Sequence, residues 1–283
     1  MAKKNKESLG LRFLYGTAVG RVILKPLTSR AVSNAMGKFM DSPLSKPMIG
    51  RFVKKNNIRL RDFHSDNFTC FNDCFTRKIK DGRRTVDMAK ASFISPCDAL
   101  LSAYKIDENT RLHIKGSIYS LPDLFESKEL AKKYAGGTCL VFRLCVTHYH
   151  RYIYLDSGCK EDNVFIPGKL HTVRPIALEA VPVFKRNCRE YTVMHTENFG
   201  DVTQMEVGAM LVGKIKNHHG KGQFTRGDEK GMFLYGGSTI IVFVEKDRVE
   251  LDPIYFEATE KGEETDVLMG QKLGTKATLK AEN

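Results

Sequence analysis

The sequence predicts an α+β protein, with a helical N-terminal region, residues 1–61, and a mostly antiparallel β-rich domain, residues 62–283. Three observations predict this. Apolar residues recur at helical spacing in the first region, with breaks at Pro26, Pro43 and Pro47. From Ala91 onward the pattern is that of strands: apolar residues alternate with a period of two in TCLVFRLCV (138–146), and other segments favour β-branched and aromatic residues. The composition, with 42% hydrophobic and 28% charged residues, is that of a globular protein able to bury a core.

Segment 9–25 reads LGLRFLYGTAVGRVILK and is expected to form one basic amphipathic helix that ends at Pro26. The residues that share its apolar face are Leu11, Leu14, Ala18 and Val22. A helix of this kind lies either in the interface of a membrane or against the domain of its own chain. The sequence leaves both alternatives open.

The remaining elements follow from local patterns. Residues 62–90 are expected to form a short helical bridge with a basic tail. Strands are expected within 111–121, 138–146, 189–197 and 238–251. A single helix is expected over 121–137, with Gly136 and Gly137 at its end, and residues 273–283 are expected to be frayed.

The formal charge of +12 predicts an anionic partner, either a nucleic acid or an anionic membrane. Many of the basic residues lie within 1–61, where acidic residues are few. No nucleic-acid-binding module is recognisable, so we expect no nucleic-acid partner. No window approaches the roughly 18 apolar residues of a transmembrane helix, and the first eight residues lack a secretory signal. We therefore expect a cytoplasmic protein.

The seven cysteines are scattered and form no CxxC pair, which argues against a disulfide framework and against a zinc site. We expect buried, reduced thiols and no metal.

Segment 226–251 contains Gly236-Gly237-Ser238-Thr239 directly before a strongly apolar run. From the residues alone, two glycines before a strand indicate a tight turn. The wider sequence changes this interpretation. Six segments, in this order, resemble motifs of the phosphatidylserine decarboxylases: FTCFNDCFTRKIK (68–80), SPCDAL (95–100), HYHRY (148–152), IPGKLHTVRP (166–175), FGDVTQMEVGAMLVGKI (199–215) and RGDEKGMFLYGGSTIIVFVEKDRVEL (226–251).

This resemblance implies a proenzyme that cuts itself between Gly237 and Ser238, giving a large chain, 1–237, and a small chain, 238–283. Ser238 would then become a covalent pyruvoyl cofactor, which decarboxylates phosphatidylserine to phosphatidylethanolamine through a Schiff base. Self-cleavage needs a base to activate the Ser238 hydroxyl, and a carboxylate to orient that base. The resemblance assigns the carboxylate to Asp98.

The histidine is less clear, because the chain departs from the family pattern Asp-Tyr-His-Arg-x-His. His148 stands at the Asp position, and Ile153 stands at the second His position. His150 and His171 are therefore the candidates for the base, with His148 behind them. His150 is also the candidate acid of the decarboxylation, and Arg151 is a candidate contact for the lipid phosphate.

The expected partners are an anionic phospholipid membrane and phosphatidylserine, at the cytoplasmic side of the cell membrane as a peripheral protein. The two cleavage products are expected to form a heterodimer, and the sequence leaves open whether this heterodimer forms a further homodimer. Two other functions compete with this interpretation: a pyruvoyl decarboxylase of a free amino acid, and a degenerate, basic lipid-binding member of the family.

Overall fold

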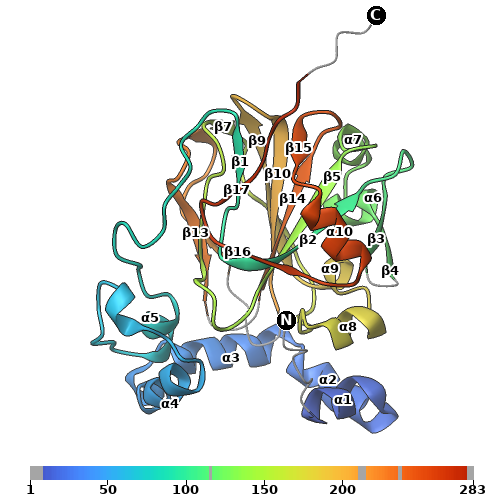
Figure 1. The fold of residues 1–283 in the computed structure, drawn as a ribbon. Helices are drawn as coiled ribbons and strands as arrows, with labels where there is room; N and C mark the ends of the chain where they lie inside the picture. The colour runs from blue at the N-terminus through green and yellow to red at the C-terminus, as the bar shows by residue number, and fades with distance from the viewer. Residues whose placement is uncertain (1–8, 115–116, 210–214, 235–237, 279–283) are drawn as a thin grey trace, which may run out of the picture.

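A computed structural model describes residues 9–114, 117–209, 215–234 and 238–278 of the chain. These residues form an α+β structure in which the sheets are antiparallel, as the sequence predicted (Figure 1). The N-terminal helices lie together at one end of the sheets. The domain boundary at residue 61 stays a prediction.

The largest sheet, which we call the central sheet, has β14 and β5 near its middle, and each of its neighbouring pairs is antiparallel. Its strands, in spatial order, are β12 (Gly222–Phe224), β7 (Gly158–Lys160), β9 (Arg189–Thr196), β10 (Gly200–Val207), β14 (Ser238–Val244), β5 (Thr138–Leu144), β2 (Ala99–Lys105) and β16 (Thr265–Val267), while β8 (Val164–Ile166) also pairs with β9.

Three smaller sheets accompany it. The first, called the side sheet below, contains β11 (Ile215–Asn217), β13 (Glu229–Phe233) and β6 (Arg151–Ile153). The second contains β1 (Ser92–Ile94), β17 (Lys272–Lys276) and β15 (Val249–Leu251), and the third contains β3 (Arg111–Ile114) and β4 (Ser117–Ser120). The prediction that the chain frays from residue 273 was wrong for β17, because this strand pairs with strands on both sides. Residues 279–283 lie outside the described residues.

The helices are short. They are α1 (Leu9–Gly16), α2 (Ala18–Leu27), α3 (Arg30–Met40), η1 (Pro43–Ser45), α4 (Pro47–Lys55), η2 (Leu60–Asp62), α5 (Phe71–Phe75), α6 (Leu121–Phe125), α7 (Lys128–Lys133), α8 (Pro175–Ala180), α9 (Val183–Arg186) and α10 (Ile254–Glu260). Within the described ranges, none of them has both the length and the apolar character that crossing a bilayer requires.

The central sheet is buried on both faces. Along β14, Ile240 and Val242 belong to one apolar cluster, whereas Ile241 and Phe243 belong to another. Side chains of a strand alternate between the two faces. Ser238 therefore faces the same side as Ile240, and we call this side the inner face.

The single helix expected over residues 9–25 is instead two helices, α1 and α2. The Thr17 side chain accepts a hydrogen bond from the Gly20 amide and caps the start of α2, while Pro26 lies inside the last turn of α2. Leu11 and Leu14 pack against the second apolar cluster, whereas Val22 is 63% exposed. The prediction that these residues share one apolar face was therefore wrong, because the break at Thr17 changes the direction of the chain.

The single helix expected over residues 121–137 is likewise broken, into α6 and α7. Glu126 has a φ of 55°, and the Ser127 side chain caps the start of α7. The guanidinium of Arg189 donates to the carbonyl oxygens of Asp123 and Leu124, which a continuing helix would have used for its own hydrogen bonds. A residue distant in sequence thus takes part in ending α6.

Candidate active site

Ser238 is the first residue of β14, at one end of the central sheet. It pairs with Leu144 of β5, and the register with β10 places Gly208 on its other side. Ser238 is completely buried, and within the described ranges its Oγ has no hydrogen-bond partner; the Oγ1 of Thr239 is in the same condition. An unpaired buried hydroxyl costs free energy, so its presence at position 238 needs a reason other than stability.

The chain crosses from one sheet to another directly before Ser238. Phe233 ends β13 in the side sheet, and Ser238 begins β14 in the central sheet. Residues 234–237 join the two strands, and Gly236 and Gly237 lie outside the described residues. The predicted cleavage point therefore falls where the chain passes between two sheets.

Asp98 reaches the same end of the sheet from the other side of β5. It directly precedes β2, where Leu100 pairs with Arg143 of β5. Because neighbouring strands are about 4.8 Å apart, the backbones at Asp98 and Ser238 are separated by about 10 Å. The register therefore brings two predicted site residues, far apart in sequence, to one end of the sheet.

The Asp98 carboxylate is 4% exposed and firmly bound. Arg84 binds both of its oxygens, with Nε 2.9 Å from Oδ1 and Nη2 2.5 Å from Oδ2. The backbone amide of Met269 also donates to Oδ1, at 2.9 Å. This ion pair raises the pKa of Arg84, mainly through the hydrogen bond to Asp98. A bidentate pair of this kind fixes the orientation of the carboxylate.

His148 follows β5, and the charge of Asp98 acts on it. Burial lowers its pKa, and the charges of Asp98 and Asp266 oppose this shift. Its Nδ1 accepts the backbone N–H of Cys145 at 3.1 Å. The neutral ring therefore carries its proton on Nε2, as assigned from this hydrogen bond, and has no second nitrogen ready to accept a proton.

His150 has the opposite tautomer. Its Nδ1 lies 2.9 Å from the carbonyl oxygen of His148, so Nδ1 carries the proton and Nε2 is the basic nitrogen of the neutral ring. The ring is completely buried and packs against Phe75, with 4.1 Å between ring centroids. The Phe233 amide donates to the His150 carbonyl oxygen at 2.9 Å. His150 is thus tied to the end of β13, beside the crossing that leads to Ser238.

His171 lies on the β10 side of Ser238. The side-chain oxygen of Asn187 accepts a hydrogen bond from the backbone amide of His171. The side-chain nitrogen of Asn187 donates to the backbone carbonyl oxygens of His171 and Gly208, both at 2.7 Å. The Tyr15 hydroxyl, 3.3 Å from Nδ1, also accepts the Thr172 amide hydrogen. The buried hydroxyl hydrogen needs an acceptor, which makes Nδ1 that acceptor and places the imidazole proton on Nε2.

The three histidines therefore differ in readiness to act as a base. Burial lowers the pKa of His171, as it does for His148, and the charges of Arg186 and Lys169 add to that shift. Both rings are thus favoured in the neutral form, with Nδ1 already accepting a hydrogen bond. Of the candidates named from the sequence, His150 is the one whose tautomer leaves Nε2 as the proton acceptor.

Arg151 does not fit its expected role. Its Nε donates to the Thr76 carbonyl oxygen at 2.7 Å, and its Nη1 lies 2.8 Å from Oε1 of Glu229. The guanidinium therefore joins α5 and β13 rather than facing a lipid phosphate.

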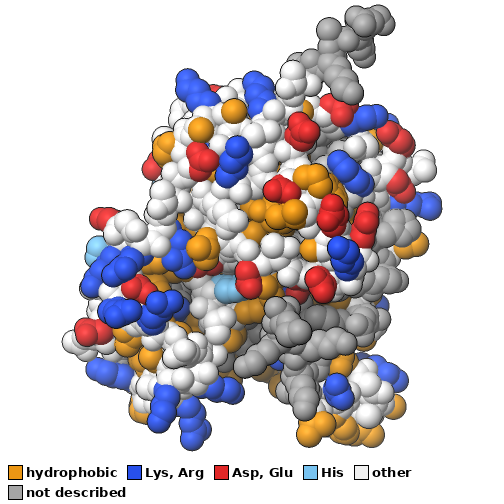
Figure 2. Space-filling model, in the orientation of Figure 1, with side chains coloured by type: hydrophobic (Ala, Val, Ile, Leu, Met, Phe, Trp, Pro, Cys, Tyr) orange, Lys and Arg blue, Asp and Glu red, His pale blue; other side chains and the backbone are white. Residues whose placement is uncertain are grey.

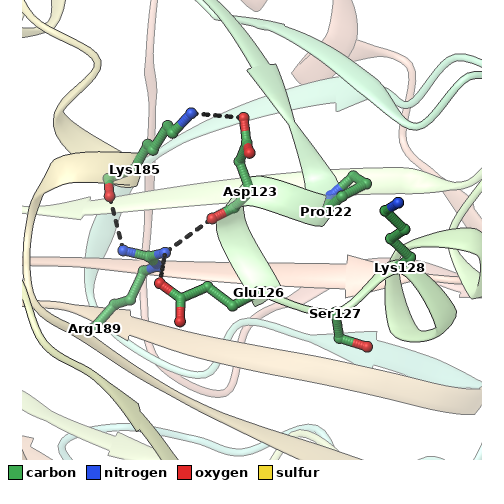
Figure 3. A pocket seen from close by; sticks show the side chains of 7 residues that line it. All are labelled: Pro122, Asp123, Glu126, Ser127, Lys128, Lys185 and Arg189. Carbon is green, nitrogen blue, oxygen red and sulfur yellow. Dashed lines mark hydrogen bonds and ion pairs between the residues drawn. The ribbon is translucent and has the colours of Figure 1, made fainter.

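A charged cavity of about 380 Å³ lies away from this arrangement (Figure 3). It is lined by Pro122, Asp123, Glu126, Ser127, Lys128, Lys185 and Arg189. Arg189 alternates with Glu190 along β9 and points to the same side as Tyr191, which belongs to the second apolar cluster. The cavity therefore faces the side of the central sheet opposite to Ser238, and we do not assign it to the candidate site.

Sequence reasoning missed three residues that hold the candidate groups: Arg84, Tyr15 and Asn187. Arg84 lies in a basic run that gave no sign of a single buried partner. Tyr15 lies in a helix whose apolar face was misassigned. Asn187 is completely buried within a polar stretch, and no local pattern distinguishes it.

Comparison with known proteins identifies the family of the chain. Residues 71–275 match the family model described as phosphatidylserine decarboxylase. "Phosphatidylserine decarboxylase proenzyme 2" of Clostridium acetobutylicum is 42% identical over 265 residues, which cover 93% of this chain and 91% of the relative. The "Phosphatidylserine decarboxylase proenzyme" of Clostridium novyi is 42% identical over 272 residues, covering 94% and 92%, and that of Desulfitobacterium hafniense is 40% identical over 272 residues, covering 94% and 91%. The chain belongs to the phosphatidylserine decarboxylase family.

Proposed function

We propose that this chain is a phosphatidylserine decarboxylase proenzyme, which cuts itself between Gly237 and Ser238 and converts Ser238 into a pyruvoyl group. The observation that carries the proposal is the state of Ser238. It is a buried serine whose Oγ has no partner within the described ranges, placed where the chain crosses between two sheets. The matched relatives are named as proenzymes of this activity.

In the proposed cleavage, Nε2 of His150 takes the hydroxyl proton of Ser238, and Oγ attacks the carbonyl carbon of Gly237. A C–O bond forms, the peptide C–N bond breaks, and the amine of residue 238 receives the proton. Loss of the α-proton of residue 238 then expels the Gly237 carboxylate and leaves dehydroalanine. Addition of water and release of ammonia give the pyruvoyl group. Asp98 supplies the negative charge that favours a protonated histidine, as its effect on the pKa of His148 already indicates.

The two cleavage products are expected to stay together. The strand β14 belongs to the small chain, and it pairs along its length with β10 and β5 of the large chain. Both of its faces are buried in apolar clusters. Breaking one peptide bond at its start leaves these contacts in place, so we propose a heterodimer of chains 1–237 and 238–283.

A pyruvoyl group supplies a ketone that condenses with a primary amine and withdraws electrons as CO₂ leaves. The position fits such a group, because the Oγ of Ser238 makes no hydrogen bond within the described ranges that its loss would break. In the decarboxylation, the protonated Nε2 of His150 is the proposed donor to the carbon that loses CO₂. Its Nδ1 keeps the ring in place through the His148 carbonyl.

We further propose that the N-terminal helices bind an anionic membrane at its cytoplasmic side, as a peripheral contact. Large apolar side chains of α1, α2 and η1 are exposed there: Leu9 (83%), Val19 (64%), Val22 (63%) and Leu44 (78%). Basic residues surround them, and Figure 2 shows apolar and basic side chains at this end of the molecule. Apolar side chains among basic ones suit an interface with anionic lipids.

The first test is intact mass spectrometry of the full chain and of the Ser238→Ala variant. We expect two chains split after Gly237 for the natural sequence, with pyruvoyl at the start of the small chain, and one uncut chain for the variant. An uncut natural chain, or a variant that is still cut, contradicts the proposal. Release of CO₂ from phosphatidylserine vesicles, but not from free serine, then distinguishes the proposed substrate from a free amino acid.

The membrane proposal is tested by flotation with vesicles that contain phosphatidylserine. Val19→Ser combined with Val22→Ser removes exposed apolar surface, so we expect binding to fall at least about tenfold, since fully burying a valine contributes about 1.5 kcal/mol and even half-burial of both gives about that total. Val164→Ser is a matched control, because Val164 is 43% exposed on β8, outside the N-terminal helices. Equal loss of binding in both variants contradicts the proposal.

A further inference from the structure

Lys230 and Glu206 form an ion pair inside the protein; both lie within segments that resemble family motifs, but the sequence assigned neither of them a role. Lys230 is 1% exposed and Glu206 is 0% exposed, by side chain, and Nζ lies 2.9 Å from Oε1. Removing two charges from water is costly, and it is offset only when the charges are well paired. A buried pair of this kind therefore fixes the two backbones that carry it.

The pair joins the two sheets that the chain crosses before Ser238. Lys230 lies on β13, which leads into the crossing, and Glu206 lies on β10, which pairs with β14. Glu206 is directly opposite Ile240, so its side chain shares the inner face with that of Ser238. As the diagonal neighbour of Glu206, Ser238 has its Cα about 8 Å from that of Glu206.

Polar partners hold both charged groups. Asn217 of β11 accepts a hydrogen bond from Nζ of Lys230 at 2.8 Å and donates to Oε2 of Glu206 at 3.2 Å. The same Asn217 amide group donates to Glu190 of β9 at 2.7 Å, and Gln204 donates to Oε1 of Glu206 at 2.9 Å. Two strands of the side sheet are thus tied to two strands of the central sheet by one connected set of hydrogen bonds.

We propose that Lys230 and Glu206 are positioning residues for self-cleavage. They set the distance and angle between the end of β13 and the start of β14, the two strands that flank the predicted cleavage point. Attack of a hydroxyl on the preceding carbonyl needs the reacting atoms within about 3–3.5 Å, so a small shift of β13 slows it strongly. This inference rests on the proposed self-cleavage.

The other end of β13 provides a matched comparison. Arg226, near its start, forms a second buried pair with Asp156, at 2.9 Å between Nη2 and Oδ1, with exposures of 4% and 1%. Asp156 is also bound by Asn198, in the turn between β9 and β10. This pair has the same chemistry, but it lies at the opposite end of the central sheet from Ser238.

The test measures how fast the full-length precursor becomes two chains after a pulse of cell-free synthesis. Each rate is normalised to the fraction that resists limited proteolysis, so that only folded molecules are counted. Lys230→Met and Glu206→Leu each leave one buried charge unpaired, and we expect folded precursor to be cut at least tenfold more slowly. The double variant restores a matched, apolar contact between β13 and β10, and we expect a rate within about threefold of the natural chain.

Arg226→Met is the control. It also leaves a buried charge unpaired, so we expect a less stable protein whose folded precursor is cut at the natural rate. If neither single variant folds, Asn217→Ala takes their place, because Asn217 is partly exposed and links Lys230 to Glu206. For this variant we expect cleavage about threefold to tenfold slower.

Three results overturn the inference: folded single variants, or Asn217→Ala in their place, that are cut at the natural rate; a double variant as slow as the single ones; or an Arg226→Met variant that is slowed equally. A natural chain that remains uncut is a different result. It overturns the proposed function itself, and the inference with it.

Discussion

The two sides of Ser238 differ in how their polar groups are held. On the β5 side, Asp98 is bound by the guanidinium of Arg84 in a bidentate ion pair. On the β10 side, His171 is bound by the neutral Tyr15 hydroxyl and, through its backbone, by a buried amide side chain. The candidate residue on the β5 side, called the charged side below, is thus held by an ion pair, and the one on the β10 side, called the neutral side below, is held by neutral hydrogen bonds. The buried Lys230–Glu206 pair of β10 is a separate group.

This difference indicates a division of roles. The charged side contains His150, whose tautomer leaves Nε2 as an acceptor and whose backbone is tied to β13. The neutral side ties α1 to the sheet, because Tyr15 contacts both His171 and Thr172. We therefore expect proton transfer on the β5 side, and attachment of the N-terminal helices on the β10 side.

The largest expected effect comes from replacing each of the two histidines, in turn, with glutamine. His150→Gln removes the proposed base and is expected to slow self-cleavage about 10²-fold to 10⁴-fold, the usual contribution of general base catalysis. His171→Gln is the matched control, and it is expected to slow cleavage less than tenfold. The measurement is the time course of the two chains by intact mass. A stronger effect at His171 would reverse the proposed division.

Loss of Arg84 is expected to have the next largest effect. Arg84→Met leaves the buried Asp98 carboxylate without its cation, which is expected to destabilise the fold by about 3 kcal/mol, the lower end for a broken buried pair because the Arg84 side chain is 24% exposed. Chemical denaturation measures this loss. Arg83→Met is the control, since the Arg83 side chain is 53% exposed and pairs with Asp62 at 3.4 Å. Equal losses of stability in the two variants would mean that the Arg84–Asp98 pair contributes no more than an exposed ion pair.

The smallest expected effect is on how the stability of the fold changes at low pH, through His171 on the neutral side. Burial lowers the pKa of His171, so protonation favours the unfolded chain, and this contribution to stability is lost as the pH falls below the ordinary histidine pKa. His171→Gln is therefore expected to lose less melting temperature between about pH 7.5 and about pH 5.5 than the natural chain.

His195 is expected to change the pH dependence of stability in the opposite direction. Its hydrogen bond to Asp201 raises its pKa, so it stabilises the fold at low pH, and this contribution is lost as the pH rises through the raised pKa. We expect His195→Gln to make the protein more sensitive to acid. Thermal unfolding at the two pH values checks both variants, and a shift of the same sign in both would contradict the assignment.

Much of the fold could be predicted from local pattern. The expected strands at 138–146 and 238–251 contain β5 and β14, because both segments are rich in the apolar and β-branched residues that a strand buried on both faces carries. The prediction failed at Thr17 and at Glu126, where a capping side chain and a distant arginine interrupt helices that the pattern would continue. It failed again at β17, whose strand pairing comes from residues far away in sequence.

The sequence by itself determined the family, the α+β class and the candidate residues Asp98, His150, His171 and Ser238, because these depend on residue types in a fixed order. Only the tertiary structure decided how the candidates are held. The tautomer of His171 is set by Tyr15, which is distant in sequence, whereas nearby backbone groups set those of His148 and His150 in the folded chain. Strand register places Asp98 and Ser238 at one end of a sheet. Such contacts depend on which strands become neighbours, and no local pattern in the chain records that.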